Sequence, residues 1–152
     1  PPRSTLFPYT TLFRSIDTDH LIEKQENMSI SEIFSQNGES YFRRLENKLV
    51  TDYYQKNNLI ISTGGGMVMD SDIMRKLKHN GIIIYLDRDY RIIMEKDIKN
   101  RPLIQNKADV ERIALERIPY YQKYADIIVN VDRPKNEVFA EIEEKIYDYL
   151  RR

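Results

Sequence analysis

Short apolar runs alternate along the chain with longer stretches in which apolar residues recur at helical spacing. Four runs have the length and composition of strands, at residues 13–17, 59–64, 81–87 and 125–131. Their apolar residues follow one another without alternation, which predicts strands covered on both faces of a sheet. Because strand-like and helix-like stretches alternate, the pattern predicts an α/β fold with a parallel sheet.

Apolar residues at helical spacing fill the connections between these strands. The spacing predicts a stop at Asn80-Gly81, directly before the third strand. The stretches that we expect to be helical are 29–38, 39–57, 70–80, 87–100, 108–125 and 135–152.

Length and composition narrow the classes of function. The 152 residues suffice for one domain with a sizeable core. The absence of cysteine excludes a thiol nucleophile and indicates the cytosol. With 24 basic and 24 acidic residues the net charge is zero, which argues against nucleic acid or anionic membrane as a partner. No apolar run approaches the length of a membrane span, and we expect a monomer that binds small molecules.

Two aspartates flank Thr18 at the predicted carboxyl end of the first strand, where open α/β sheets bind ligands. If the segment is extended, Asp17 and Asp19 point the same way. Such a pair suits a hydrated Mg²⁺ and a substrate hydroxyl. The alternative is a helix N-cap or a solvated turn.

An arginine is framed by two glutamates in the stretch GESYFRRLE. Helical spacing places Glu39, Arg43 and Glu46 on one face. An arginine held in this way is oriented in advance, and its planar fork suits a carboxylate. Ordinary surface pairing between neighbouring turns is the alternative.

Three consecutive glycines, Gly64, Gly65 and Gly66, follow the second strand directly. Glycine lets backbone N–H groups approach an anion or a ring closely, although a tight structural turn is the alternative. The segment is no Walker A loop, and neither that motif nor G-x-G-x-x-G occurs in the 152 residues.

Further arginines are candidates for anion binding. Arg101 precedes a polar stretch and has the character of a lid arginine in phosphoryl transfer, or of a solvated residue after a helix end. Arg117 is a candidate second guanidinium for the carboxylate that Arg43 faces. Arg133 and Pro134 follow the last strand and either cradle a flat base or form a plain turn.

In this order and spacing, DTD, GESYFRRLE, GGG, RPLI and R-x-P-x-Y resemble the shikimate kinase family over residues 16–152. That family has the three-layer P-loop kinase fold of nucleoside monophosphate kinases. Its members move the γ-phosphoryl group of ATP, with Mg²⁺, to the 3-hydroxyl of shikimate in aromatic amino-acid synthesis. The resemblance implies the same fold and reaction here. The rival hypotheses are another small-molecule P-loop kinase, for gluconate or a nucleotide, and a non-catalytic module that binds a small acid.

The resemblance also implies roles for residues that face the substrate. Asp19 would meet the shikimate hydroxyl and assist its deprotonation. Arg43, steadied by Glu46, and Arg117 would hold the carboxylate, and the glycines at 64–66 would line the ring.

A second group of roles concerns the nucleotide and the metal. The resemblance implies Asp17 and Ser62 near Mg²⁺, Arg101 in the lid, and Arg133 with Pro134 in the adenine loop.

The chain departs from the family before the DTD motif, where the family has a strand, a Walker A loop and a helix. TLFPYTTLFRS, at 5–15, resembles a translated sequencing adapter, and the alternative is a natural strand with turns. We therefore expect residues 1–15 to be a non-native segment and 16–152 to be a kinase domain lacking those elements. Because the missing strand is the central one of the family's sheet, we expect two half-sheets with unpaired inner edges and no activity.

Overall fold

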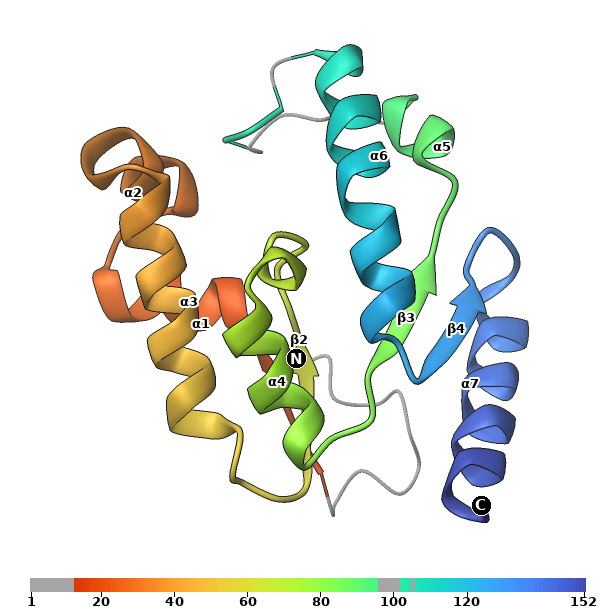
Figure 1. Cartoon of the computed structure of the whole chain (residues 1–152). Helices are drawn as coiled ribbons and strands as arrows, with labels where there is room; N and C mark the ends of the chain where they lie inside the picture. Colours follow the sequence, from red (N-terminus) through yellow and green to blue (C-terminus); the bar gives the residue numbers. More distant parts are fainter. Residues whose placement is uncertain (1–12, 96–101, 105) are drawn as a thin grey trace. The chain divides into compact units, whose positions relative to one another are not determined.

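The computed structural model describes residues 13–95, 102–104 and 106–152, and they divide into two compact units that meet in sequence between Asn80 and Gly81 (Figure 1). In chain order the first unit contains β1 (Arg14–Asp17), α1 (Thr18–Glu26), α2 (Ile30–Asn37), α3 (Glu39–Tyr53), β2 (Leu59–Ser62), the 3₁₀ helix η1 (Met67–Met69) and α4 (Ser71–His79). The second contains β3 (Ile84–Asp87), α5 (Tyr90–Met94), α6 (Lys107–Tyr124), β4 (Ile127–Asn130) and α7 (Lys135–Leu150).

Each unit holds one sheet of two parallel strands. β1 pairs with β2, and β3 pairs with β4. The prediction of an α/β fold with parallel strands is therefore confirmed. Within the described residues β2 pairs with β1 alone and β3 with β4 alone, so the two expected half-sheets are present.

The prediction that both faces of the strands are covered is confirmed only in part. Burial alternates along β2 and β4, which is the pattern of a strand with one covered face. On β4, Ile127 and Val129 are buried against Val138 of α7, whereas Ile128 is 41% exposed. Leu86 of β3 is 53% exposed. On β3, Ile84 packs with the cluster of β4 and α7, whereas the neighbouring Tyr85 stacks on Tyr121 of α6 with ring centroids 5.0 Å apart, so helices contact both faces of this sheet.

Apolar contacts fix the helices of the first unit. Ile22 of α1, Ile33 of α2, and Phe42 and Leu49 of α3 form one buried cluster. Full burial of an aliphatic side chain of this size contributes about 1.5–3 kcal/mol. The cluster therefore holds α1 and α3, which carry the candidate site, against each other.

A second cluster joins α3 to the segment that follows β2. Val50 packs with Met67 of η1 and Ile73 of α4. The glycine segment lies just before η1, so this cluster sets its position relative to α3.

The chain begins α1 where the sequence pattern predicts extended backbone. Thr18 and Asp19 are helical, and the assumption that residues 17–19 continue the strand is wrong. Asp17 ends β1 and caps α1 at the same time, because its side chain accepts a hydrogen bond from the backbone N–H of His20 at 3.0 Å. At the other end of the unit, α4 ends at His79 before Asn80, as predicted.

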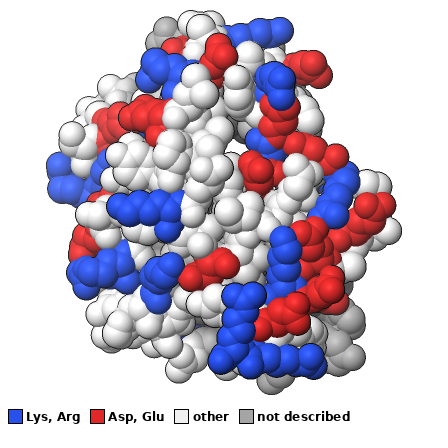
Figure 2. Space-filling model, turned by 45° about the vertical axis from the view of Figure 1, so that its right-hand side comes forward, with Lys and Arg blue, Asp and Glu red and all other residues white. Residues whose placement is uncertain are grey.

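The distribution of charged side chains and the hydropathy of the helices match what the composition predicts. On the face drawn in Figure 2, acidic and basic side chains are interspersed without a broad area of one sign. Among the described helices, none combines the length and the apolar character needed to cross a membrane.

Candidate functional site

Asp19 lies in the first turn of α1, and one of its carboxylate oxygens stands out by its burial. Its Oδ1 atom is buried and accepts no hydrogen bond from the described residues. Burial, together with the negative charges of Asp17 and Glu23, raises the pKa of Asp19, while the charge of Arg43 lowers it. A buried oxygen without a partner is costly, which indicates that a ligand hydroxyl or water completes it.

Arg43 is held by two glutamates of its own helix, as predicted. Its Nη1 atom donates to Oε2 of Glu46 at 2.7 Å, and Nη2 and Nε donate to Oε1 of Glu39 at 2.8 Å and 3.2 Å. These bonds use three of the five N–H groups of a guanidinium. Within the described residues, one N–H on each terminal nitrogen thus remains for a ligand.

Glu46 is the buried member of this cluster. Its side chain is 1% exposed, whereas that of Glu39 is 48% exposed. A buried carboxylate needs a paired cation, and Glu46 therefore fixes Arg43 more firmly than Glu39 does. Burial lowers the pKa of Arg43, but the hydrogen bonds and charges of both glutamates outweigh burial and raise it, so the guanidinium stays charged.

Gly64 and Gly66 approach these side chains so closely that a side chain at either position would displace them. A Cβ at Gly64 would lie 2.7 Å from Oδ1 of Asp19 and 3.2 Å from Oε1 of Glu46. A Cβ at Gly66 would lie 2.6 Å from Cζ of Arg43. Gly65 stands between them in the sequence. Contact distance therefore favours glycine at positions 64 and 66, and the segment brings the carboxylate of α1 and the guanidinium of α3 to one place.

Thr18 is a part of the site that the sequence reasoning missed. Its side chain is fully buried, and its Oγ1 atom accepts a hydrogen bond from the backbone N–H of Gly64 at 3.1 Å. This bond joins residues 46 positions apart and locks the glycine segment to the start of α1. The signal in the sequence was its position between two aspartates at a strand end, where a threonine hydroxyl can reach the segment that follows the neighbouring strand.

The two residues assigned to the metal are neighbours. Asp17 and Ser62 are register partners at the carboxyl ends of β1 and β2. Both carry oxygen atoms, the donor type that Mg²⁺ prefers, and a magnesium ion commonly keeps several of its waters. In the ranges that the structure describes, no group of three or more histidine, aspartate or glutamate side chains is placed to hold a metal ion.

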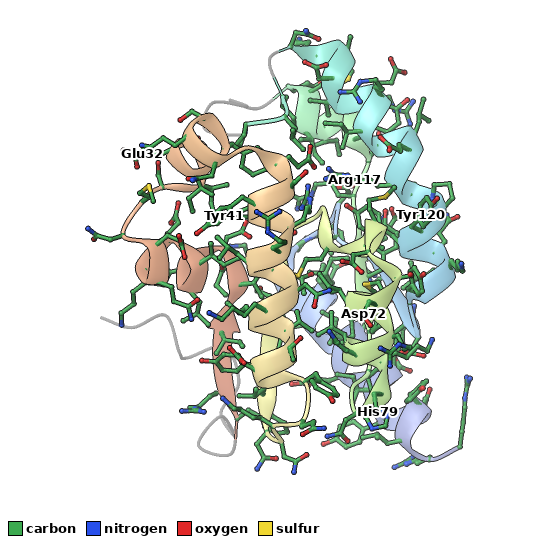
Figure 3. All side chains as sticks on the ribbon, turned by 60° about the vertical axis from the view of Figure 1, so that its left-hand side comes forward. Glu32, Tyr41, Asp72, His79, Arg117 and Tyr120 are labelled. Carbon is green, nitrogen blue, oxygen red and sulfur yellow. The ribbon has the colours of Figure 1, made fainter. Side chains whose placement is uncertain are left out.

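The remaining candidates belong to the second unit or lie outside the described residues. Arg117 comes from α6 (Figure 3). Arg133 donates from Nε to the backbone carbonyl of Asn130 at 3.1 Å and pairs with Glu141. Pro134 stands at the N-cap position of α7, so the segment after β4 is a turn into a helix. Arg101 lies outside the described residues.

Three comparisons with known proteins agree. The family model described as shikimate kinase matches residues 10–147. The shikimate kinase of Aquifex aeolicus is 37% identical over 129 residues, which cover 83% of this chain and 76% of that protein. The shikimate kinase of Thermodesulfovibrio yellowstonii is 38% identical over 143 residues, 91% of this chain and 82% of that protein.

Solved structures give the same result for the fold. The crystal structure of the Aquifex aeolicus shikimate kinase matches with a TM-score of 0.81 at 33% identity and covers 95% of this chain and 87% of that one. A shikimate kinase from Acinetobacter baumannii, solved in complex with shikimate, matches with a TM-score of 0.79 at 24% identity, covering 91% and 78% of the two chains. The P-loop kinase fold expected from the motifs is therefore confirmed, and the chain belongs to the shikimate kinase family.

Proposed function

We propose that this chain binds shikimate and, as part of a complete kinase, directs the γ-phosphoryl group of ATP to the 3-hydroxyl of shikimate. The observation that carries the proposal is the convergence at Gly64–Gly66 of two groups: a carboxylate oxygen of Asp19 that has no hydrogen-bond partner in the described ranges, and the guanidinium of Arg43, which uses three of its five N–H groups there. A hydroxy acid has the two matching groups. Membership of the family supports the same assignment.

Asp19 is the residue for the hydroxyl. Its unpartnered Oδ1 atom accepts a hydrogen bond from the hydroxyl and so aims the oxygen at the phosphoryl group. The raised pKa makes the carboxylate a better proton acceptor. As the new P–O bond forms and the bond to ADP breaks, the hydroxyl proton passes to Asp19 and then to water.

Arg43 is the residue for the carboxylate. Each of its two terminal nitrogens donates one N–H group to a glutamate and keeps a second one, and a guanidinium can give a carboxylate two hydrogen bonds. Arg117 is the second guanidinium in this proposal. The backbone of the glycine segment lines the ring, and a side chain at Gly64 or Gly66 would collide with Asp19 or Arg43.

ATP and Mg²⁺ are the partners on the other side of the reaction. A bound Mg²⁺ supplies positive charge that offsets the charge of the phosphate oxygens. The oxygen atoms of Asp17 and Ser62 fit such an ion and its waters. Arg101 acts in the lid, and Arg133 with Pro134 forms the loop against the adenine. We place the protein in the cytosol, because its sequence holds no cysteine and its substrates are small and polar.

We further propose that residues 1–15 are not native and that residues 16–152 need the family's strand, Walker A loop and helix ahead of them for turnover. The support is the resemblance of 5–15 to a translated adapter and the lack of a Walker A motif in the 152 residues. Genomic sequence that reads in frame into residue 16 with a G-x-x-x-x-G-K-[ST] motif is the expected result, and a start codon directly before residue 16 would contradict it.

Calorimetry tests the substrate. The 152-residue chain should bind shikimate, and Arg43→Lys, which keeps the charge but loses the fork, should weaken binding by about 1.4 kcal/mol or more, that is ten-fold. Arg91→Lys is the matched control, since Arg91 is 75% exposed and, among the described residues, pairs with Asp89 of its own turn. Preference for gluconate or a nucleoside monophosphate over shikimate would overturn the assignment in favour of another kinase.

A further inference from the structure

A polar cluster between α3 and α4 lies next to the candidate site without touching it. Lys76 of α4 is its centre, with a side chain only 15% exposed. Its Nζ atom contacts Asp72 at 2.6 Å and donates to Asn47 Oδ1 and Thr51 Oγ1, each at 2.9 Å. An ammonium group has three donors, so all of them are used. Two of the three reach across to α3.

Asn47 of α3 completes the cluster with both ends of its amide. Its Nδ2 atom donates to Asp70 at 3.4 Å and to Asp72 at 3.2 Å, while its Oδ1 atom accepts from Lys76. Asp72, labelled on α4 in Figure 3, has a pKa lowered by hydrogen bonds from Lys76, Arg75 and Asn47. Only an amide offers donors to two carboxylates and an acceptor to an ammonium at once.

We call Arg43 with Glu46 on one side and Gly66 on the other the carboxylate grip. The two ends of the polar cluster lie next to these two sides in the sequence. Asn47 follows Glu46, the buried partner of Arg43, directly in α3. Asp70 follows Gly66 by four residues and caps α4 through hydrogen bonds to the N–H groups of Asp72 and Ile73. The cluster therefore ties the helix turn that carries Glu46 to the helix that starts after the glycine segment.

The contact between Arg43 and Gly66, which this cluster supports, is tight. The guanidinium of Arg43 lies directly against Gly66, at a distance that would exclude even a methyl group. A small shift of α4 against α3 would either open this contact or push the guanidinium from its glutamates. Apolar packing of Val50, Met67 and Ile73 resists separation of α3 from α4. Hydrogen bonds are directional, so they prevent α4 from sliding along α3 better than apolar contacts do.

We propose that Asn47 and Lys76 are positioning residues for shikimate binding: they hold α4 in register with α3 and thereby keep Gly66 under the guanidinium of Arg43. The inference rests on the proposed function, because the group being positioned is the carboxylate grip. Neither residue meets the substrate.

Nuclear magnetic resonance and calorimetry on the 152-residue chain test the inference. Asn47→Asp keeps the size of the side chain but replaces its two donors with a third carboxylate beside Asp70 and Asp72. We expect it to shift the resonances of Arg43 Nε and of the Gly66 amide and to weaken shikimate binding about ten-fold, since small displacements in a binding site have large effects. Unchanged resonances together with an affinity within two-fold of the parent would overturn the proposal.

The matched control is Arg75→Ala. Arg75 also pairs with Asp72 but is 73% exposed, and in the described part of the chain it has no hydrogen bond or ion pair with α3. We expect it to leave both resonances and the affinity unchanged at a temperature where all variants are folded. An equal effect from Arg75→Ala would show that the resonances and the affinity depend on the charge of Asp72 rather than on the hydrogen bonds to α3, and would contradict the proposal.

A second pair of variants covers the case in which Asn47→Asp does not fold. Thr51→Val removes one acceptor of Lys76 without changing the size of the side chain, and Thr51→Ser keeps the hydroxyl. The valine variant should shift the same resonances and the serine variant should restore them; a serine variant that behaves like valine contradicts the proposal. If the parent chain fails to bind shikimate, the proposed function fails, whereas the resonances still decide whether the cluster positions Arg43.

Discussion

The guanidinium of Arg43 fills the space that a side chain at Gly66 would need. The two residues lie on different elements, one on α3 and the other directly before η1, and the contact joins them across a separation of 23 positions (66 minus 43). The atoms in the way belong to the end of a flexible side chain. A substitution at position 66 therefore displaces the arginine rather than the backbone.

Gly66→Ala should leave the chain folded and remove shikimate binding. The new methyl group pushes Arg43 away from Glu46 and Glu39, so the fork no longer faces the ligand. We expect a loss of at least about ten-fold in affinity by calorimetry, with little change in circular dichroism. Gly38→Ala is the control, because Gly38 has φ of 80° and open space around it. It should cost about 1–3 kcal/mol of stability through backbone strain and leave affinity nearly unchanged.

Glu46→Gln should cost both stability and affinity, whereas Glu39→Gln should cost little of either. The Glu46 side chain is buried against Arg43, and removal of one charge from such a pair costs about 3 kcal/mol. Glu39 is half-exposed, and solvent screens its pair, so less than about 1 kcal/mol is expected. Urea unfolding of the two variants gives both values. Equal losses from the two substitutions would contradict the ranking.

Asp19→Asn should raise the free energy of unfolding at neutral pH. Burial and the charges of Asp17 and Glu23 raise the pKa of Asp19, so its ionisation opposes folding. The stability linked to this group is fully present below the unfolded value of 3.8 and is lost as the pH rises through the folded pKa. Asparagine removes that loss, so the advantage of the variant should be seen at pH 7 and should vanish near pH 3. We expect less than about 1 kcal/mol, because the side chain is only half-buried.

The same substitution separates stability from function. Asparagine has no basic oxygen for the hydroxyl proton, so a complete enzyme with Asp19→Asn should lose most of its kcat while its melting temperature rises. A variant that is more stable and equally active would remove Asp19 from the mechanism.

The chain of 152 residues should show no shikimate-dependent turnover of ATP. Its sequence contains no Walker A motif, and without the loop's N–H groups and lysine the β- and γ-phosphates lack their main contacts. A coupled assay for ADP checks this. A fusion that places the family's strand, Walker A loop and helix before residue 16 should restore turnover, and activity of the unextended chain would contradict the prediction.

Local patterns were sufficient for most elements of the fold. Each observed strand falls inside a predicted run, and α2, α4 and α7 lie within the stretches of helical spacing. α3 ends at Tyr53, short of the predicted boundary, because Lys56–Asn58 turn into β2, with Asn58 at a φ of 58°. α1 was not predicted because Asp17 is both the last residue of β1 and the N-cap of α1. Such overlap leaves no turn residue to mark the boundary.

The contacts within the site were only partly predictable. The i to i+3 and i to i+4 pairs around Arg43 follow from helix geometry alone. The bond from Gly64 to Thr18 and the tie from Lys76 to Asn47 span 46 and 29 positions. Such contacts depend on how helices pack, and hydrophobic periodicity gives the buried face of a helix but not its partner residue.

The described contacts among Asp19, Arg43, Glu46 and the glycine segment all fall within the unit that ends at Asn80. Under the proposed function, most of the residues that bind the phosphate acceptor, Arg117 excepted, are therefore contiguous in the sequence. Chimeras with another small-molecule kinase, joined after Asn80, would exchange the acceptor alcohol and leave the donor nucleotide to the remaining sequence. Changes of acceptor could then accumulate during evolution without loss of the nucleotide preference.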